Sequence, residues 1–170
     1  MTNYLFPDNP KYQLRHGEIG DRAKLLSFLQ ITYQELYPQQ QNYQHLESTV
    51  DRYLSSDTPL WFVTANCDDA ASKMLPQRDA SIACIWLGMA IDQITGIRHP
   101  NIFLIYVEPG YRRQGIGREL IRQAEVWAKL EGYSQISLQV FTTNQPAIDL
   151  YGSLGYEARS ISMFRELDPQ

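Results

Sequence analysis

The chain has 170 residues and a mass of 19.7 kDa, a length that fits one compact domain able to bury its own core. Its composition, 44% hydrophobic and 20% charged, excludes disordered, collagen-like and low-complexity chains. The 15 basic and 19 acidic residues give a net charge of −4, which argues against a general nucleic-acid binder. We therefore expect a single domain over 1–170 with no nucleic-acid partner.

Cysteine usage and hydropathy indicate the cellular setting. Cys67 and Cys84 are too few for a disulfide framework, which favours a reducing environment. The first fourteen residues show no secretory signal, and the longest nearly apolar run, 82–91, is shorter than the roughly 20 residues that a bilayer requires. The three histidines lie far apart, with no cysteine or carboxylate at ligand spacing. We expect a cytoplasmic protein with no membrane partner and no metal site.

The first part of the chain predicts two helices and then a strand. Asp21 is a candidate N-cap, and apolar residues recur at helical spacing from there until Pro38. A second helical pattern follows at 46–54. The apolar run 60–63 comes after a proline and is typical of a strand.

The middle of the chain predicts a loop and two further strands. Residues 68–79 are polar and irregular, which is typical of a surface loop. The run 81–91 predicts a strand that is bent or bulged near Gly88. Turn residues at 92–100 precede an apolar strand at 102–107.

The last part alternates helices with strands. Residues 115–131 carry an apolar stripe at steps of three and four, and Gly132 is placed to end that helix. Alternation at 136–140 predicts a half-buried strand, 144–154 a short helix, and 161–167 a last strand. The whole order predicts an α/β domain of the α+β type with a mixed sheet.

The segment 107–118 carries the chemistry. It places two glycines and several arginines between a strand and the start of a helix. Free N–H groups and the positive dipole end at a helix start attract phosphate oxygens, and glycine lets the backbone approach an anion closely. Residues 101–130 hold five basic side chains against three acidic ones, although the whole chain is acidic. The segment favours an anionic ligand, with a solvated basic helix start as the alternative.

Two well-known phosphate loops are excluded at named positions. Gly110 and Gly115 have the P-loop spacing, but Ile116 and Gly117 stand where lysine and serine or threonine are required. A dinucleotide fingerprint needs a third glycine where Leu120 stands. Neither nucleotide-binding motif is therefore predicted.

The segment resembles the coenzyme A loop of the GCN5-related N-acetyltransferases, the GNAT family, whose motif is Arg/Gln-x-x-Gly-x-Gly/Ala. Arg112, Gly115 and Gly117 fit it. Downstream, residues 144–156 resemble the family's Asn-x-x-Ala-x-x-Leu-Tyr-x-x-x-Gly-Phe helix. The two blocks lie within 101–156, a third of the chain.

The resemblance implies a fold and an activity. The fold would be a single GNAT-like domain, with a mixed, mostly antiparallel sheet, flanking helices and splayed central strands. The activity would be transfer of an acetyl group from acetyl-CoA, as cosubstrate and without a metal, to a primary amine of a small molecule or a peptide. A homodimer is left open. The alternative is a non-catalytic acyl-CoA-binding or regulatory module.

The resemblance also implies site residues. The backbone of Ile105, Tyr106 and Val107 would bind the pantetheine arm. Asn144 would contact the cofactor, with a plain N-cap as the coexisting alternative, and Tyr151 would be the catalytic acid at the sulfur, with a core aromatic as the alternative. The loop that cradles the pyrophosphate would consist of Arg112, Arg113, Gln114, Gly115, Ile116, Gly117 and Arg118.

The general base is where the sequence departs from the family. Asn101 and Gln139 stand where different family members carry a glutamate, and an amide cannot accept a proton. Asp92, His99 and Glu35 are the remaining candidates, with a solvated surface role as the alternative for each. A base acting through water, or an amine that arrives partly neutral, is also open.

Overall fold

The computed structural model describes residues 11–65 and 81–167. The chain forms two compact units, Met1–Gln139 and Val140–Gln170. A single domain over 1–170 stays a prediction. Cys67 and the predicted loop at 68–79 lie outside the described residues.

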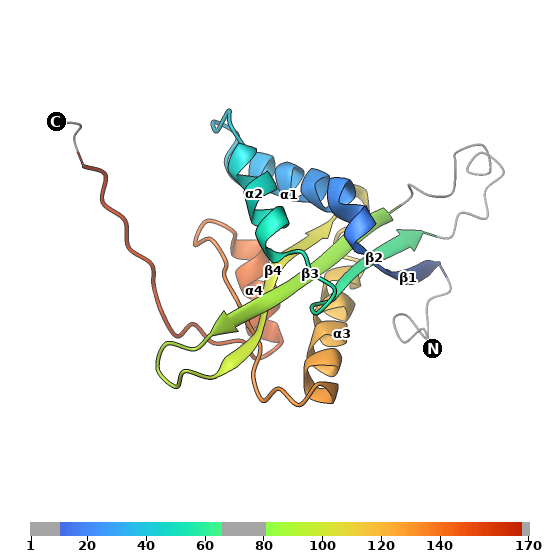
Figure 1. Ribbon diagram of the computed structural model, residues 1–170. Coiled ribbons are helices and arrows are strands. Elements are labelled where there is room, and N and C mark those ends of the chain that lie inside the picture. Colours follow the sequence, from blue (N-terminus) through green and yellow to red (C-terminus); the bar gives the residue numbers. More distant parts are fainter. Residues whose placement is uncertain (1–10, 66–80, 168–170) are drawn as a thin grey trace. The chain divides into compact units, whose positions relative to one another are not determined.

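The first unit is built on a five-stranded sheet in the order β1-β2-β3-β4-β5, of which Figure 1 labels β1 to β4. Strands β1 to β4 are antiparallel to their neighbours, and β5 runs parallel to β4. The predicted mixed, mostly antiparallel sheet is confirmed. The strands are β1 (Tyr12–His16), β2 (Leu60–Ala65), β3 (Ser81–Ile91), β4 (Arg98–Val107) and β5 (Ser137–Leu138).

Helices cover both faces of this sheet. The helices α1 (Arg22–Leu36) and α2 (Gln44–Tyr53) lie over one face, and α3 (Ile116–Leu130) lies over the other (Figure 1). Two short 3-10 helices, η1 (Ile19–Asp21) and η3 (Pro109–Tyr111), precede α1 and α3. No helix in the described ranges 11–65 and 81–167 is both long and apolar enough to cross a membrane.

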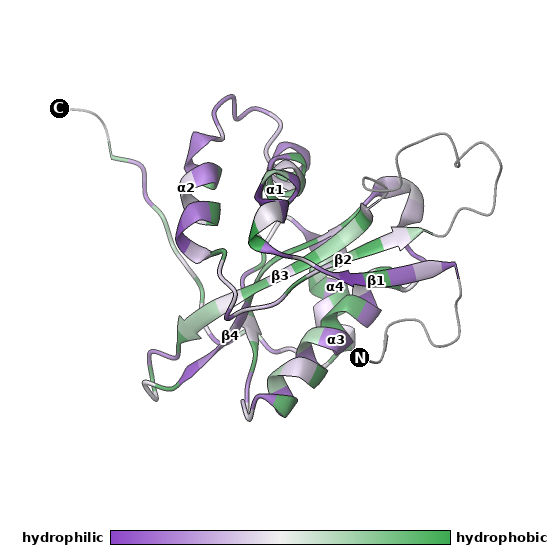
Figure 2. Ribbon diagram, turned by 45° about the vertical axis from the view of Figure 1, so that its right-hand side comes forward, coloured by the Kyte–Doolittle hydropathy of each residue, from purple (hydrophilic) through white to green (hydrophobic). Residues whose placement is uncertain are grey.

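The sheet separates two hydrophobic clusters. Strands β2 and β3 are largely hydrophobic (Figure 2), and their side chains alternate between the two faces. Phe62 and Trp86 are fully buried in the cluster with α1 and α2, whereas Ile85 and Leu87 are fully buried in the cluster with Leu120 of α3. These buried layers fix the position of α3 relative to the end of β4, where the motif of Arg112, Gly115 and Gly117 lies.

The predicted helices are confirmed, but one cap differs. Asp21 directly precedes α1 and makes no side-chain cap to it. Its carboxylate accepts instead from the Arg15 guanidinium at 2.8 Å and from the Glu18 N–H at 2.9 Å. Gly132 ends α3 as predicted: its φ is +83°, and the N–H groups of Gly132 and Tyr133 donate back to carbonyls of the last turn.

Strands β3 and β4 form a long hairpin. The bulge predicted near Gly88 is confirmed as a register shift between Trp86 and Leu87. The prediction for β4 was too short, because the strand begins at Arg98 and includes Pro100, which pairs with Met89. Pairing with the long β3 moves the start of β4 back beyond Pro100 to Arg98, so the turn is confined to residues 92–97.

The end of β4 is splayed away from β5. The predicted strand at 136–140 is reduced to two residues, which pair with β4 as Asn101 with Ser137 and Ile102 with Leu138. Within the described residues, β4 therefore has no strand neighbour on this side from 103 to 107. The splayed central strands that the resemblance implied are present in this form.

The second unit contains α4 (Gln145–Ser153). Asn144 is its N-cap and accepts from the Ala147 N–H, as the sequence predicts. The strand predicted at 161–167 is wrong, because these residues adopt no regular structure and Ile161, Phe164 and Leu167 are exposed. A strand is stable only beside a hydrogen-bonded neighbour, and the described part of this unit offers none.

Candidate functional site

The turn between β4 and α3 has a backbone shaped by two left-handed residues. Gly115, the N-cap of α3, has a φ of +85°, and Arg113 has a φ of +63°. Only glycine adopts this conformation without a steric cost, which explains the first glycine of the motif. Gly117 lies in the first turn of α3, where N–H groups have no partner within the helix.

This turn presents a row of hydrogen-bond donors. Among the backbone hydrogen bonds of turns, loops and caps in the described part of the chain, none has its donor N–H in residues 113–117. The first bond that closes the turn onto α3 runs from the Glu119 N–H to the Gly115 carbonyl at 3.1 Å. The preceding N–H groups and the helix dipole together suit a bound anion.

Side chains of the motif hold the turn in place. The Arg112 guanidinium donates to both carboxylate oxygens of Glu35 in α1, at 2.7 and 2.9 Å, and its Nε donates to the Val107 carbonyl at 2.7 Å. The side chain of Gln114 accepts from the Tyr12 hydroxyl at 2.5 Å and donates to the Gly110 carbonyl at 3.3 Å. The turn is thus tied to α1, β1 and the end of β4.

These contacts change the expected source of positive charge. Arg112 is paired with Glu35 and Arg122 with Glu119 at 2.6 Å, so two of the five basic side chains are already neutralised. Arg113 is exposed at the turn. Attraction for an anion at this turn therefore rests more on the backbone N–H groups than on the arginine count.

The open edge of β4 continues from this turn. The Glu108 N–H donates to Ile82 of β3 at 2.8 Å, and residues alternate along an antiparallel strand between one neighbour and the other. Ile105 and Val107 therefore direct their backbone groups away from β3, and Arg112 already occupies the Val107 carbonyl. Tyr106 pairs with Cys84 of β3, so Ile105 and Val107 are the members of the predicted trio that face the open edge.

The other predicted site residues belong to the second unit. Asn144 caps α4, and Tyr151 lies within the same helix. Tyr151 is buried, its ring lies 5.9 Å from that of Tyr156, and burial raises its pKa to about 12. The cofactor contacts predicted for both residues stay predictions.

The three candidate bases have different surroundings. Glu35 is held by Arg112. Asp92 accepts from the N–H groups of Ile94 and Thr95, both at 2.9 Å, and these bonds hold its pKa below the ordinary value. The surface role considered for His99 is wrong, because its side chain is buried and hydrogen-bonded to Ser137. Sequence reasoning missed Ser137, although it lies opposite Asn101 in the β4–β5 pair.

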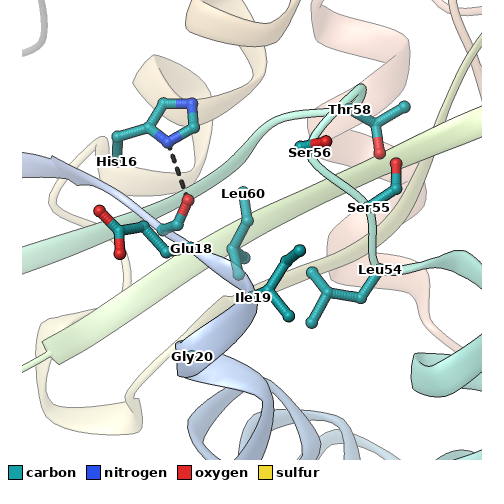
Figure 3. A pocket seen from close by; sticks show the side chains of 10 residues that line it. His16, Glu18, Ile19, Gly20, Leu54, Ser55, Ser56, Thr58 and Leu60 are labelled. Atoms are coloured by element: carbon teal, nitrogen blue, oxygen red, sulfur yellow. Dashed lines mark hydrogen bonds between the residues drawn. The ribbon is translucent and has the colours of Figure 1, made fainter.

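A cavity of about 370 Å³ lies elsewhere in the first unit (Figure 3). Ile19, Leu54 and Leu60 gather at its apolar side, and the hydroxyls of Ser55 and Thr58 lie at its polar side. No residue of the motif at 112–118 lines it. Across the described ranges, no group of three or more His, Cys, Asp or Glu side chains is placed to hold a metal ion.

Two curated proteins are similar in sequence to part of the chain. It is 47% identical over 57 residues to thialysine N-epsilon-acetyltransferase of Sus scrofa, covering 32% of this chain and 34% of that protein. It is 36% identical over 72 residues to the ribosomal protein bS18-alanine N-acetyltransferase of Escherichia coli K12, covering 42% and 48%. The matches thus span about a third to a half of these curated relatives.

A solved structure extends the likeness to nearly the whole chain. A protein from Pyrococcus furiosus assigned as an acetyl transferase superposes with a TM-score of 0.68 at 25% identity, covering 92% of this chain and 99% of its own. The model of the acetyltransferase (GNAT) family matches residues 25–156. Together with the left-handed turn at the start of α3 and the splayed β4, this match shows that the chain belongs to the GNAT family of acetyltransferases.

Proposed function

We propose that this chain transfers an acetyl group from acetyl-CoA to a primary amine by direct attack in a ternary complex. The observation that carries the proposal is the donor-rich turn at 113–117 beside the open edge of β4. The diphosphate of the cofactor is an anion suited to those N–H groups. The pantetheine arm carries amides that can pair with the backbone of Ile105 and with the Val107 N–H as an added strand does.

We also propose, from the family resemblance, that Asn144 contacts the cofactor and that Tyr151 acts on the sulfur. With a pKa near 12, the Tyr151 hydroxyl stays protonated throughout the neutral range and can donate to the departing thiolate. A thiol with a pKa of about 8.5 lies about 3.5 units below it, so complete proton transfer costs about 5 kcal/mol. Burial of Tyr151 thus favours a hydrogen bond to the sulfur over complete transfer. Such a bond is strongest in a dry site.

We propose the class of the acceptor amine from the basicity of amines and from the names of the two curated relatives. The two curated relatives are named for acetylating a lysine-like side-chain amine and the alanine of a ribosomal protein. A lysine-like amine with a pKa near 10.4 is neutral only about one part in 2,500 at pH 7, whereas an α-amino group costs about 1 kcal/mol to neutralise. We propose either an α-amine acceptor or a more basic amine whose acetylation rises steeply with pH. A flat kcat/KM between about pH 6.5 and 9 with a lysine-like amine would contradict this.

A non-catalytic acyl-CoA-binding module is the rival function, because Asn101 and Gln139 replace the family glutamates. The test incubates the protein with acetyl-CoA and a panel of lysine analogues, peptides with a free N-terminus and polyamines. Free thiol is measured together with the mass of the products. Thiol release that depends on an amine, with an N-acetylated product, supports the enzyme. Tight binding of acetyl-CoA with no such release from any amine class supports the module.

A further inference from the structure

The cavity of about 370 Å³ lies between two connecting segments of the first unit (Figure 3). Residues within 16–20, at the end of β1 and in η1, form one wall, and residues within 54–60, between α2 and β2, form the other. Small-molecule sites have volumes of about 300–1,000 Å³, so this cavity can hold a small ligand. It adjoins the start of α1, whereas Glu35, which holds the cofactor turn, lies about 20 Å further along that helix. The cavity is therefore separate from the proposed cofactor site.

Backbone hydrogen bonds hold both walls of the cavity in place. The Gly17 N–H donates to the Leu60 carbonyl at 2.6 Å, and a Cβ on Gly17 would lie 2.5 Å from Leu60 Cγ, so this close approach requires glycine. The Asp21 N–H donates to the Glu18 carbonyl at 2.9 Å, and the Glu18 N–H donates to the Asp21 carboxylate at 2.9 Å. The Pro59 carbonyl accepts from β3 at 3.0 Å. The cavity is thus formed before any ligand enters.

Thr58 brings an unsatisfied hydroxyl to this cavity. The residue is 7% exposed, and its buried Oγ1 has no hydrogen-bond partner among the described residues. Figure 3 shows this hydroxyl on the same side of the cavity as that of Ser55. A hydroxyl oxygen has two lone pairs, so both groups can accept from a ligand; Thr58 reaches it by rotation about its Cα–Cβ bond. Because a buried hydroxyl without a partner destabilises a fold, a donor at this place would stabilise the protein.

The remaining lining residues favour a positively charged ligand with an apolar body. Ile19, Leu54 and Leu60 gather on one side of the cavity. Among the described residues that line it, Glu18 is the only acidic side chain, and none is a lysine or an arginine. His16 also lines it, and its Nδ1–H donates to a backbone carbonyl at 2.8 Å. An ammonium group would therefore meet acceptor oxygens and a carboxylate, whereas an anion would meet no permanently charged cation.

We propose that this cavity binds a small primary amine with a short apolar chain. The ammonium group donates to the Thr58 and Ser55 hydroxyls, the Glu18 carboxylate on the other wall favours its charge, and the chain packs against the isoleucine and the two leucines. The ligand contacts η1 directly before α1 and the segment directly after α2, so it joins the two helices and stabilises the folded chain. This binding is separate from the proposed acetyl transfer and does not rest on it.

The test titrates three probes of similar length, hexylamine, hexan-1-ol and hexanoate, into the full chain without acetyl-CoA. Methyl groups of isoleucine and leucine are followed by NMR. Hexylamine should shift the signals of Ile19 and Leu54 and leave Ile116, at the start of α3, unchanged. Hexan-1-ol should bind more weakly, and hexanoate should not bind. Equal binding of the three probes, or shifts confined to Ile116, would overturn the proposal.

Two variants test the polar groups of the cavity. Thr58→Val keeps the shape of the side chain and removes the hydroxyl, so it should raise the melting temperature of the free protein and weaken hexylamine binding by about tenfold. Glu18→Gln should weaken binding of hexylamine but not of hexan-1-ol. Thr49→Val, which alters an exposed threonine of α2 whose hydroxyl donates to the His45 carbonyl, is the control and should bind like the wild type. Unchanged hexylamine affinity in both Thr58→Val and Glu18→Gln would refute this amine site and leave the acetyl transfer untouched.

Discussion

At the scale of single residues, Tyr151 is the side chain on which the proposed chemistry depends most. It is buried and its pKa is about 12, as expected for either a general acid or a core aromatic. Tyr151→Phe removes the hydroxyl and keeps the ring. If the hydroxyl acts on the thiolate, kcat should fall by about 10²–10⁴-fold with little change in acetyl-CoA affinity. A kcat within about threefold of wild type, with an altered melting temperature, would assign Tyr151 to the core alone.

The Tyr151 hydroxyl should also affect the stability of the fold at alkaline pH. Because the folded pKa of Tyr151 is raised from 10 to about 12, the neutral phenol stabilises the fold fully below pH 10, and this contribution is lost as the pH rises through 12. Tyr151→Phe should therefore lose less stability than the wild type between pH 10 and 12 in a urea titration. Burial also raises the pKa of Tyr33, so part of the alkaline loss should persist. Identical pH curves would contradict the burial of the Tyr151 hydroxyl.

Glu35 is predicted to position the turn and not to act as the base. Both oxygens of its carboxylate accept hydrogen bonds from Arg112. Because this ion pair is partly exposed, breaking it should lower the free energy of unfolding by no more than about 1 kcal/mol. Glu35→Gln should keep the pH profile of kcat/KM. Asp51→Asn, which breaks the similar Arg22–Asp51 pair between α1 and α2, is the matched control. A loss of about 10²-fold or more in kcat/KM for Glu35→Gln alone, with the pH dependence removed, would make Glu35 the base.

At the scale of elements, the β3–β4 hairpin depends on Gly88. A Cβ at this position would overlap the ring of Phe103, and that ring is itself packed against Trp86 and Tyr53. Gly88→Ala should destabilise the fold by about 1–3 kcal/mol in urea titration, because the ring must move. Gly20→Ala, with nothing within 4 Å of its Cβ, should change stability little.

Adding Phe103→Leu to Gly88→Ala tests the stated cause. The smaller side chain should recover part of the lost stability, since it makes room for the new methyl group. If the double variant loses the sum of the two single effects, the clash with Phe103 is not the reason for the loss.

Elements with their own periodicity could be predicted from the sequence, and elements that depend on a partner could not. The stripe of α3 and its glycines at 115 and 132 specify a helix and both its ends without reference to the rest of the fold. The length of β5 and the missing strand at 161–167 depend on hydrogen bonds to other segments. No local sequence pattern predicts hydrogen bonding between strands that are distant in the chain.

The site divides in the same way. The turn at 112–117 could be predicted because the left-handed backbone at Gly115 favours glycine whatever the rest of the fold does. The hydrogen bonds that join His99, Ser137 and Asn101 could not, because they depend on the register that places Ser137 opposite Asn101. The ion pair of Arg112 with Glu35 joins residues 77 positions apart, so the sequence overstated the free positive charge of the turn.

At the scale of the whole molecule, family membership and the local geometry point to one cofactor. The family match spans 25–156 and so includes most of α1, which holds the turn through Glu35, and all of α4, which carries Tyr151. The strand β4 runs from the turn at 112–117 back to Asn101, which pairs with Ser137 of β5. We therefore propose that the turn at 113–117 binds the diphosphate of acetyl-CoA.

Calorimetric titration of coenzyme A into the wild type, Gly115→Asp and Gly132→Asp tests whether this turn binds the diphosphate. Both glycines have a left-handed φ, +85° and +83°, and nothing lies within 4 Å of an added Cβ at either. The two variants therefore share a similar backbone cost, but Gly115→Asp alone places a carboxylate where phosphate oxygens would bind. We predict that Gly115→Asp loses at least tenfold in affinity, which is about 1.4 kcal/mol, and that Gly132→Asp binds like the wild type. Wild-type affinity in a folded Gly115→Asp variant would contradict the account.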